Sequence, residues 1–147
     1  MRLLANREHS KNELTQKMLL KGHQRATVES VVDELATEGW QNDARYAESF
    51  IRSRLLKGQG PARIIYDLRQ QGIRINDDSV LDRLDQAAQE LFGGWLALLT
   101  QVYRKKFGFD DRLSGTEWVK RKQFLLQRGF TGAMLAELIK HLNIKLS

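Results

Sequence analysis

The side chains best suited to chemistry in this sequence are lysines and arginines, and the chemistry they support is the binding of anions. The 147 residues include 24 Lys and Arg against 18 Asp and Glu, which gives a net charge of +6. Residues 43–74 carry seven Lys/Arg and three Asp/Glu, and residues 102–128 carry eight and three, whereas residues 75–101 carry one and five. Two basic segments around an acidic one are typical of a protein that binds a polyanion or a nucleoprotein.

These cations predict a partner-binding surface. Arg45, Arg52 and Lys57 follow each other at spacings of seven and five residues, so we expect them roughly together on one helix, with Arg54 pointing elsewhere. The alternative for any such run is ordinary solvation of an exposed helix face. The candidate partner-binding residues are Arg45, Arg52, Arg54, Lys57, Arg63, Arg69, Arg104, Lys105, Lys120 and Lys122.

Two runs of three cations, residues 104–106 and 120–122, form the second basic cluster. Three consecutive residues spread over roughly 200° of a helix, so they cannot all contact one partner, and we expect at least one of each run to be simply solvated.

Catalytic and metal-binding patterns are missing from the sequence. There is no cysteine, and His9, His23 and His141 have neither each other nor a pair of carboxylates at ligand spacing. The acidic residues of 77–85 are explained by a helix start, where the helix dipole favours carboxylates. No nucleophile, base and orienting residue can be combined into a catalytic group. We therefore expect no enzyme activity, no metal and no cofactor.

Gly58 and Gly60 suggest a phosphate-binding loop at first sight. Such a loop needs a strand before it and a lysine with Ser or Thr at the start of the following helix, but this chain has Pro61 and Ala62 there. Pro61 also lacks the amide hydrogen that would bind phosphate. A tight turn between packed helices is the favoured interpretation.

The elements that must position the cations are helices, since nearly every segment has helical periodicity and none alternates with period two. Ser10 and Glu13 form a capping-box pattern, and we expect Thr27, Asn42 or Asp43, Asn76 and Thr116 to cap later helices. Pro61 fits a first helical turn. The expected helices span residues 10–21, 28–38, 43–56, 61–71, 77–90, 95–107, 116–128 and 133–143.

One motif repeats about every fifty residues: an apolar helix end, a glycine and usually another apolar residue. Gly22, Gly72 and Gly129 lie 50 and 57 residues apart, and each follows an apolar residue by four positions. The ninth residue after each glycine is again apolar (Val31, Leu81, Leu138). This self-similarity predicts an all-α fold, an elongated and curved tandem array of about three three-helix repeats. The expected repeats are residues 1–42, with a shortened leading helix near residues 2–6, residues 43–92 and residues 93–147.

The tryptophans favour structural roles over base stacking. Trp95 and Trp118 lie on the apolar faces of their expected helices, and Trp40 follows a glycine where two repeats meet. Stacking on nucleic-acid bases is the alternative for each of them.

Several stretches resemble the RecX family, bacterial regulatory proteins that act on the RecA recombinase. They are Gly39-Trp40-Gln41-Asn42-Asp43-Ala44-Arg45-Tyr46-Ala47, Lys57-Gly58-Gln59-Gly60-Pro61-Ala62-Arg63-Ile64 with Asp67-Leu68 and Gly72-Ile73, the helix from Trp95 to Arg104-Lys105-Lys106-Phe107-Gly108, and Phe124-Leu125-Leu126-Gln127-Arg128-Gly129-Phe130. Gln41 departs from the aliphatic residue usual in the family, and we expect it to soften that turn. The resemblance covers about residues 2 to 142.

The resemblance implies a modulator that binds the RecA–DNA filament and limits its extension, strand exchange, ATP hydrolysis and co-protease role in the SOS response. The lack of cysteine and of a long apolar run separately leads us to expect a soluble cytoplasmic protein. We expect a monomer with weak, non-specific affinity for single- or double-stranded DNA. The chain has no apolar run near the roughly 20 residues of a membrane span. The alternative is a stand-alone DNA-binding protein built from helix-turn-helix-like units.

Overall fold

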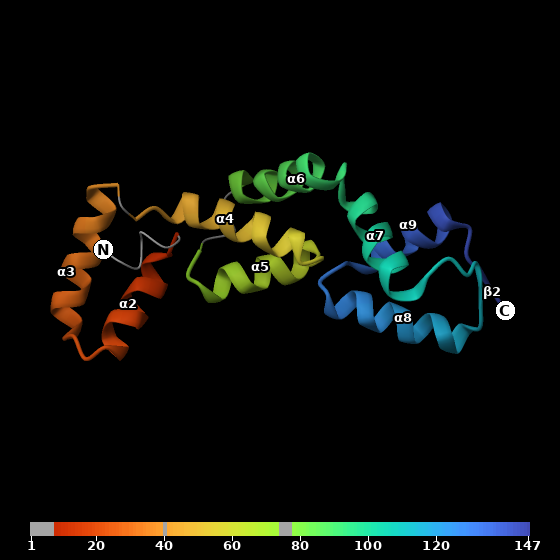
Figure 1. Ribbon diagram of the computed structural model, residues 1–147, viewed down its shortest axis with the longest axis horizontal. Coiled ribbons are helices and arrows are strands. Elements are labelled where there is room, and N and C mark those ends of the chain that lie inside the picture. The colour runs from red at the N-terminus through yellow and green to blue at the C-terminus, as the bar shows by residue number, and fades with distance from the viewer. Residues whose placement is uncertain (1–7, 40, 74–77) are drawn as a thin grey trace.

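A computed structural model describes residues 8–39, 41–73 and 78–147, and within these ranges the chain is almost entirely helical. The prediction of an all-α fold is confirmed. The helices are α2 Lys11–Leu20, α3 Arg25–Thr37, α4 Asp43–Leu56, α5 Pro61–Gln70, α6 Asp78–Phe92, α7 Trp95–Phe107, α8 Gly115–Gln127 and α9 Gly132–Leu142. They follow one another along an extended molecule, with α2 and α3 at one end and α8 and α9 at the other (Figure 1).

Helix starts follow local capping chemistry. Ser10 accepts from the Glu13 amide while the Glu13 carboxylate accepts from the Ser10 amide, so the predicted capping box is present. Asn42 caps α4 by accepting from the Arg45 amide, and Pro61 occupies the first turn of α5. These contacts satisfy amides that have no partner within the helix.

Two predicted caps are wrong. Thr27 lies inside α3, which begins at Arg25 after the extended residue Gln24, so its own backbone is helical and cannot cap. Thr116 lies inside α8, because Ser114 two residues earlier accepts from the Glu117 amide and starts the helix at Gly115. In both cases the residue at the helix start, Gln24 or Ser114, lies earlier in the chain than the predicted cap.

The repeated glycine motif is a helix-terminating turn. Gly22, Gly72 and Gly129 all have positive φ (91°, 79° and 101°), a conformation that glycine adopts without a Cβ penalty. After each glycine, the next amide donates to the carbonyl of the apolar residue four positions before the glycine, as in His23 to Met18 at 3.3 Å. This is the Schellman arrangement, in which the apolar residue also helps to bury the turn.

The apolar residues divide into two separate cores. A small cluster between α2 and α3 consists of Leu14, Met18, Val28 and Val32. A larger cluster continues from Tyr46 on α4 to Ile144 near the C-terminus. The sequence pattern predicts that Leu81 faces the core together with Val80 and Leu84, but its side chain is 40% exposed while the other two are buried. Helices α4 to α9 therefore share one core, and the α2–α3 pair has its own.

The helices pack in two groups that follow the order of the second and third predicted repeats. Helix α4 packs on α5 and α6, while α9 packs on α7 and α8. Helix α6 also packs on α7 and so links the two groups. The exact boundaries at residues 42/43 and 92/93 stay a prediction.

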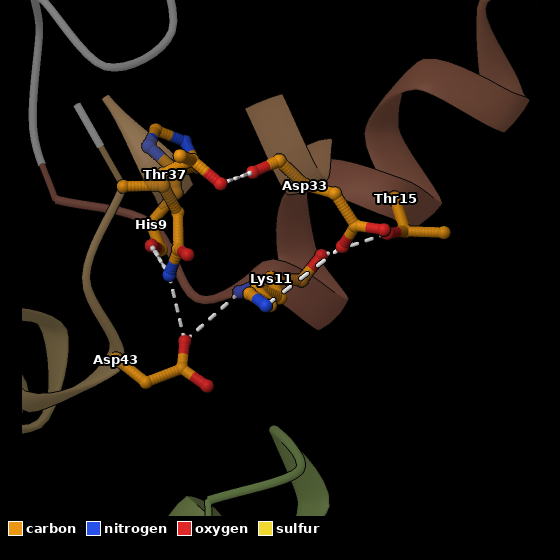
Figure 2. A network of polar contacts seen from close by, with 7 residues as sticks. His9, Lys11, Thr15, Asp33, Thr37 and Asp43 are labelled. Carbon is orange, nitrogen blue, oxygen red and sulfur yellow. Dashed lines mark hydrogen bonds and ion pairs between the residues drawn. The ribbon is translucent and has the colours of Figure 1, made fainter. Parts of the chain in front are cut away.

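A polar network joins the α2–α3 pair to α4 (Figure 2). The Asp43 Oδ1 atom accepts from the Lys11 amide at 3.0 Å and from the Gln41 side chain at 2.7 Å. Gln41 is buried and also donates to the His9 carbonyl at 3.3 Å. The residue expected to soften this turn is instead held by both sides of the junction.

A backbone contact joins the α4–α5 loop to the α8–α9 loop. The Gly60 amide donates to the Arg128 carbonyl at 2.7 Å, and the Ala62 amide donates to the Gly129 carbonyl at 2.9 Å. A Cβ at Gly60 would lie 2.5 Å from the Gly129 carbonyl carbon, and a Cβ at Gly129 would lie 2.4 Å from the Arg63 Cβ. Glycine is needed on both sides because the two backbones touch. We call this contact the glycine clasp.

The α7–α8 loop contains a short strand that the sequence did not predict. Strand β1 (Arg112–Leu113) pairs in parallel with β2 (Lys145–Leu146), and the Ser147 amide donates to the Leu113 carbonyl at 3.0 Å. Strands of two residues are too short to show alternation. The pair ties the end of the described chain to the loop before α8.

Several expectations lie outside the described residues. They concern the leading helix at residues 2–6, the role of Trp40, the cap at Asn76 and the acidic residue Asp77. The side chain of Asp78 is also outside what the structure describes.

The glycine clasp gives a stability prediction. Gly60 has an ordinary φ of −86°, so Gly60→Ala tests the close contact without a backbone penalty. The new methyl group would press on backbone that cannot rotate away, and we expect a loss of about 2 kcal/mol or more in the free energy of unfolding. Urea denaturation followed by circular dichroism measures it.

Gly132→Ala is the matched control, because Gly132 is helical and has no atom within 4 Å of a built Cβ. This variant should be unchanged or slightly more stable, since alanine is favoured over glycine in helices by up to about 1 kcal/mol. Equal stability of the two variants would contradict the clasp as a close-packed contact.

Candidate partner-binding surface

Arg52 is held between two helices by carboxylates. Its guanidinium donates to Glu90 of α6 at 2.6 Å and to Glu48 of its own helix at 3.0 Å. The hydrogen bond with Glu90 and then that with Glu48 raise the pKa of Arg52. In return the Arg52 hydrogen bond, followed by that from Gln86, lowers the pKa of Glu90. Arg52 thus joins α4 to α6, and much of its charge is balanced inside the chain.

Arg54 and Arg63 meet at one carboxylate. Each lies 3.7 Å from Asp67 Oδ2, although they come from α4 and α5. The Arg54 guanidinium also lies 4.5 Å from the centre of the Phe50 ring. Arg63 donates to the Gln127 carbonyl at 3.4 Å, beside the glycine clasp. Two of the predicted cations are therefore brought together, with one negative charge between them.

Arg45 reaches toward the other junction. Its side chain lies 3.2 Å from Glu8 and donates to the Gly39 carbonyl at 2.8 Å, so it contacts the chain before α4. Arg45, Arg52 and Lys57 contact different neighbours along α4. Their use by one partner stays a prediction.

Lys57 and Lys105 line one groove, which has a volume of about 570 Å³. The groove lies between the end of α4, one side of α7 and the end of α8. Its lining residues are Leu55, Leu56, Lys57, Gly58, Phe92, Leu98, Gln101, Val102, Lys105, Lys106, Phe124 and Arg128. The structure thus unites predicted cations from both basic segments at the place where α4 and α7 meet.

The residues of the 120–122 run do not share one environment, and the one set apart from the other two is buried and not solvated as expected. Lys120 and Lys122 are exposed, whereas Arg121 is buried and donates to the Tyr103 hydroxyl at 2.9 Å and to Glu117 at 3.0 Å. Burial opposes the Arg121 charge, but the hydrogen bonds with Tyr103 and Glu117 outweigh it, and the pKa of Arg121 is raised. Arg121 holds α8 against α7 and is unavailable to a partner.

The remaining predicted cations lie on exposed helix ends. Arg104 stacks over Phe109, with its guanidinium carbon 4.7 Å from the ring centre, and Arg69 is exposed in the last turn of α5. Lys106 and Arg128 were absent from the predicted set. Arg128 is the residue before the repeated glycine, and no pattern in the sequence places it next to α7.

The described residues contain no group of three or more His, Asp or Glu placed to hold a metal ion. His9 is buried, with its Nε2 atom 3.0 Å from the Lys17 ammonium, while His23 and His141 are exposed. No described helix has both the length and the apolar character that crossing a membrane requires. Gly58 and Gly60 follow helix α4 rather than a strand, as expected for a turn between helices.

Two family models and several known proteins match this chain. Models of the second and first three-helix domains of RecX match residues 42–74 and 1–35. Regulatory protein RecX of Halorhodospira halophila is 41% identical over 131 residues, which cover 89% of this chain and 78% of that protein. The chain belongs to the RecX family. Regulatory protein RecX of Pseudomonas entomophila is 38% identical, with 95% of this chain and 86% of that protein covered.

Solved RecX structures share the fold. The crystal structure of RecX from Lactobacillus salivarius superposes with a TM-score of 0.68 at 20% identity, covering 98% of this chain and 92% of that one. A second crystal structure of regulatory protein RecX superposes with a TM-score of 0.66 at 21% identity, covering 95% of this chain and 67% of that one. The tandem helical array is therefore shared with RecX proteins.

The buried arginine of this RecX chain gives a stability prediction. Arg121→Ala would remove the donor to the buried Tyr103 hydroxyl and the packing of the guanidinium over Phe107. We expect a loss of about 2 kcal/mol or more in the free energy of unfolding, measured in urea. Lys122→Ala, which changes an exposed neighbour, should stay within about 0.5 kcal/mol of the parent. Similar losses in both variants would contradict the structural role of Arg121.

The Arg52–Glu90 pair gives a pH prediction. Because the pKa of Glu90 is lowered in the folded chain, its contribution to stability is present above the ordinary carboxyl pKa and is lost as the pH falls through the folded value. Glu90→Gln should be less stable than the parent at neutral pH, and the gap should close in acid. Urea unfolding across the acid range measures this.

Glu137→Gln changes an exposed carboxylate that takes part in none of the ion pairs found among the described residues, and it serves as the control. The difference in unfolding free energy between Glu137→Gln and the parent should not change with pH in the way expected for Glu90→Gln. A Glu90→Gln gap that stays constant from neutral to acid pH would count against the pairing.

Proposed function

We propose that this RecX-family chain binds the RecA–DNA filament and inhibits its extension, ATP hydrolysis, strand exchange and co-protease activity in the SOS response. The observation that carries the proposal is the groove between α4, α7 and α8, where Lys57 and Lys105 of the two basic segments converge. Membership of a family of regulatory proteins supports a binding role. The proposal involves no chemistry by the chain itself.

The arrangement of helices suits a long partner. Successive helix groups extend along the molecule, so cations near one end and near the other can contact different subunits of a filament (Figure 1). Simultaneous contacts add to the overall affinity even when each one is weak. Inhibition then follows from occupation of the filament.

The second candidate is a stand-alone DNA-binding protein, favoured by the three-helix units and by the exposed Lys120 and Lys122 on α8. Weak and salt-sensitive affinity for DNA fits both candidates, since lysines and arginines bind phosphates without regard to sequence. Tight, sequence-selective binding without RecA would favour the second candidate and would count against the first.

The test of function is ATP hydrolysis by RecA on single-stranded DNA, with the chain added well below the RecA concentration. We expect strong inhibition by the parent. Lys57→Glu with Lys105→Glu should raise the concentration needed for half inhibition by at least about tenfold, because like charges then face an anionic partner.

Lys21→Glu with Lys140→Glu is the matched control. It makes the same change in net charge at two exposed lysines that do not line the groove. Circular dichroism must show that both double variants are folded. Absence of inhibition by the folded parent would overturn the proposed function, and equal inhibition by both variants would exclude the groove lysines.

A further inference from the structure

The groove between α4, α7 and α8 is lined by apolar side chains and by four cations, which we call the rim cations. Its apolar lining comes from Leu55, Leu56, Phe92, Leu98, Val102 and Phe124. Its charged lining comes from Lys57, Lys105, Lys106 and Arg128, and Gln101 is the neutral polar residue among them. No carboxylate belongs to the lining, so the groove has the opposite charge to an acidic ligand.

The rim cations have no carboxylate partner among the described residues, in contrast to four of the predicted arginines, which are Arg45, Arg52, Arg54 and Arg63. Arg52, Arg54 and Arg63 each form at least one ion pair with Asp or Glu. None of the ion pairs in the described chain involves Lys57, Lys105, Lys106 or Arg128. Arg128 donates to the Lys57 carbonyl at 3.4 Å, which fixes its position without neutralising it. The positive charge of the rim is therefore available to a partner.

One apolar side chain of the groove, that of Leu56, is open to solvent. Leu56 is 69% exposed, although it adjoins the buried Leu55. An apolar side chain from a partner would cover it and gain the free energy of removing that surface from water. An ion or a sugar–phosphate chain would pair with the rim cations but would leave Leu56 exposed.

The Phe124 ring, one of the two phenylalanine rings that line the groove, is poorly placed to stack with a base. The Lys106 ammonium lies 5.4 Å and the Arg128 guanidinium 4.9 Å from the centre of the Phe124 ring, and Phe107 meets that ring edge to face at 5.4 Å. Binding of single strands relies on aromatic faces that are open to bases. This favours a peptide over a nucleic acid.

The groove is formed before a partner arrives. The glycine clasp joins the α4–α5 loop to the α8–α9 loop next to it, and α4 and α7 share one apolar core. A preformed site binds with a smaller entropic cost than one that must order on binding. Its volume of about 570 Å³ suits a few side chains rather than a folded domain.

We propose that this groove binds a short, extended peptide segment of the protein partner, in which acidic residues flank one or two large apolar side chains. The carboxylates would pair with Lys57, Lys105, Lys106 and Arg128, and the apolar side chains would cover Leu56 and Val102. The inference rests on the proposed function, because the segment belongs to the protein that the chain regulates. It goes further in assigning the groove to protein and not to DNA.

The test uses a fluorescein-labelled peptide, Gly-Asp-Glu-Leu-Phe-Glu-Asp-Gly, and fluorescence anisotropy with the full chain. Two control peptides carry Asn and Gln in place of the acids, or Ser in place of Leu and Phe. We expect the acidic apolar peptide to bind, and each control peptide to bind at least about tenfold more weakly. Equal binding of the neutral peptide, or no binding of the acidic apolar peptide, would overturn the proposal.

Matched variants locate the site. Leu56→Ser and Lys105→Glu should each weaken peptide binding by at least about fivefold, because they remove an apolar and a charged contact. Leu20→Ser, at a side chain 86% exposed on α2, and Lys140→Glu, on α9, should change it by less than about twofold. Weakening by the control variants equal to that by the groove variants would refute the assignment.

Two further measurements separate the groove from nucleic acid and from the proposed function. The first is competition by a short oligo-dT. The proposal would be overturned, and the groove assigned to DNA, if oligo-dT displaced the peptide and its affinity were lowered by Lys105→Glu but unchanged by Leu56→Ser. Inhibition of RecA ATP hydrolysis is measured in parallel. Inhibition without peptide binding would overturn the groove assignment alone, whereas specific peptide binding without inhibition would support the groove and overturn the proposed function.

Discussion

The contact between two glycine-containing loops is the constraint on which the larger part of the molecule depends. Gly60 and Gly129 let the α4–α5 and α8–α9 loops approach until the Gly60 and Ala62 amides donate to the carbonyls of Arg128 and Gly129 at 2.7 and 2.9 Å. Side-chain packing can adapt to a change of volume, but backbone in contact with backbone has few ways to move. The distance between the end of α4 and the end of α8 is therefore fixed, and the cationic groove is formed between those two ends.

The two junctions along the array are built in different ways. Between α2–α3 and α4, the Asp43 carboxylate accepts from the Lys11 amide and the Gln41 side chain, and the apolar clusters of the described residues stay separate. From α4 onward the apolar core is continuous and the clasp adds backbone hydrogen bonds. Hydrogen bonds such as those at Asp43 add modestly to stability, because water competes for the same groups. A shared apolar core adds to stability in proportion to its buried area.

Local chemistry explains which features could be predicted from the sequence. Ser10 with Glu13, Pro61 and the repeated glycines act through neighbours a few residues away, so their effects can be read directly. Where two local signals competed the prediction chose wrongly, since Ser114 with Glu117 is also a capping pattern and it precedes Thr116. Leu81 has the right spacing from Gly72, yet the rotation of α6 exposes it.

The candidate site was harder to predict because its residues meet through long-range packing. Lys57 follows α4, Lys105 lies on α7 and Arg128 follows α8, and only the packing of these helices creates the groove. Arg121 appears equivalent to Lys120 and Lys122 in the sequence, but its partner Tyr103 is 18 residues away on another helix. Charge counts identified the basic segments and could not show which cations are already paired within the chain.

The division of the apolar residues into two cores affects how the chain unfolds. The α2–α3 cluster rests on four buried side chains, and it meets the rest of the described chain mainly through polar contacts. We expect such a segment to form a separate cooperative unit, which opens at a lower free energy than the larger core. Opening of the α2–α3 pair would then leave the helices around the groove in their native packing.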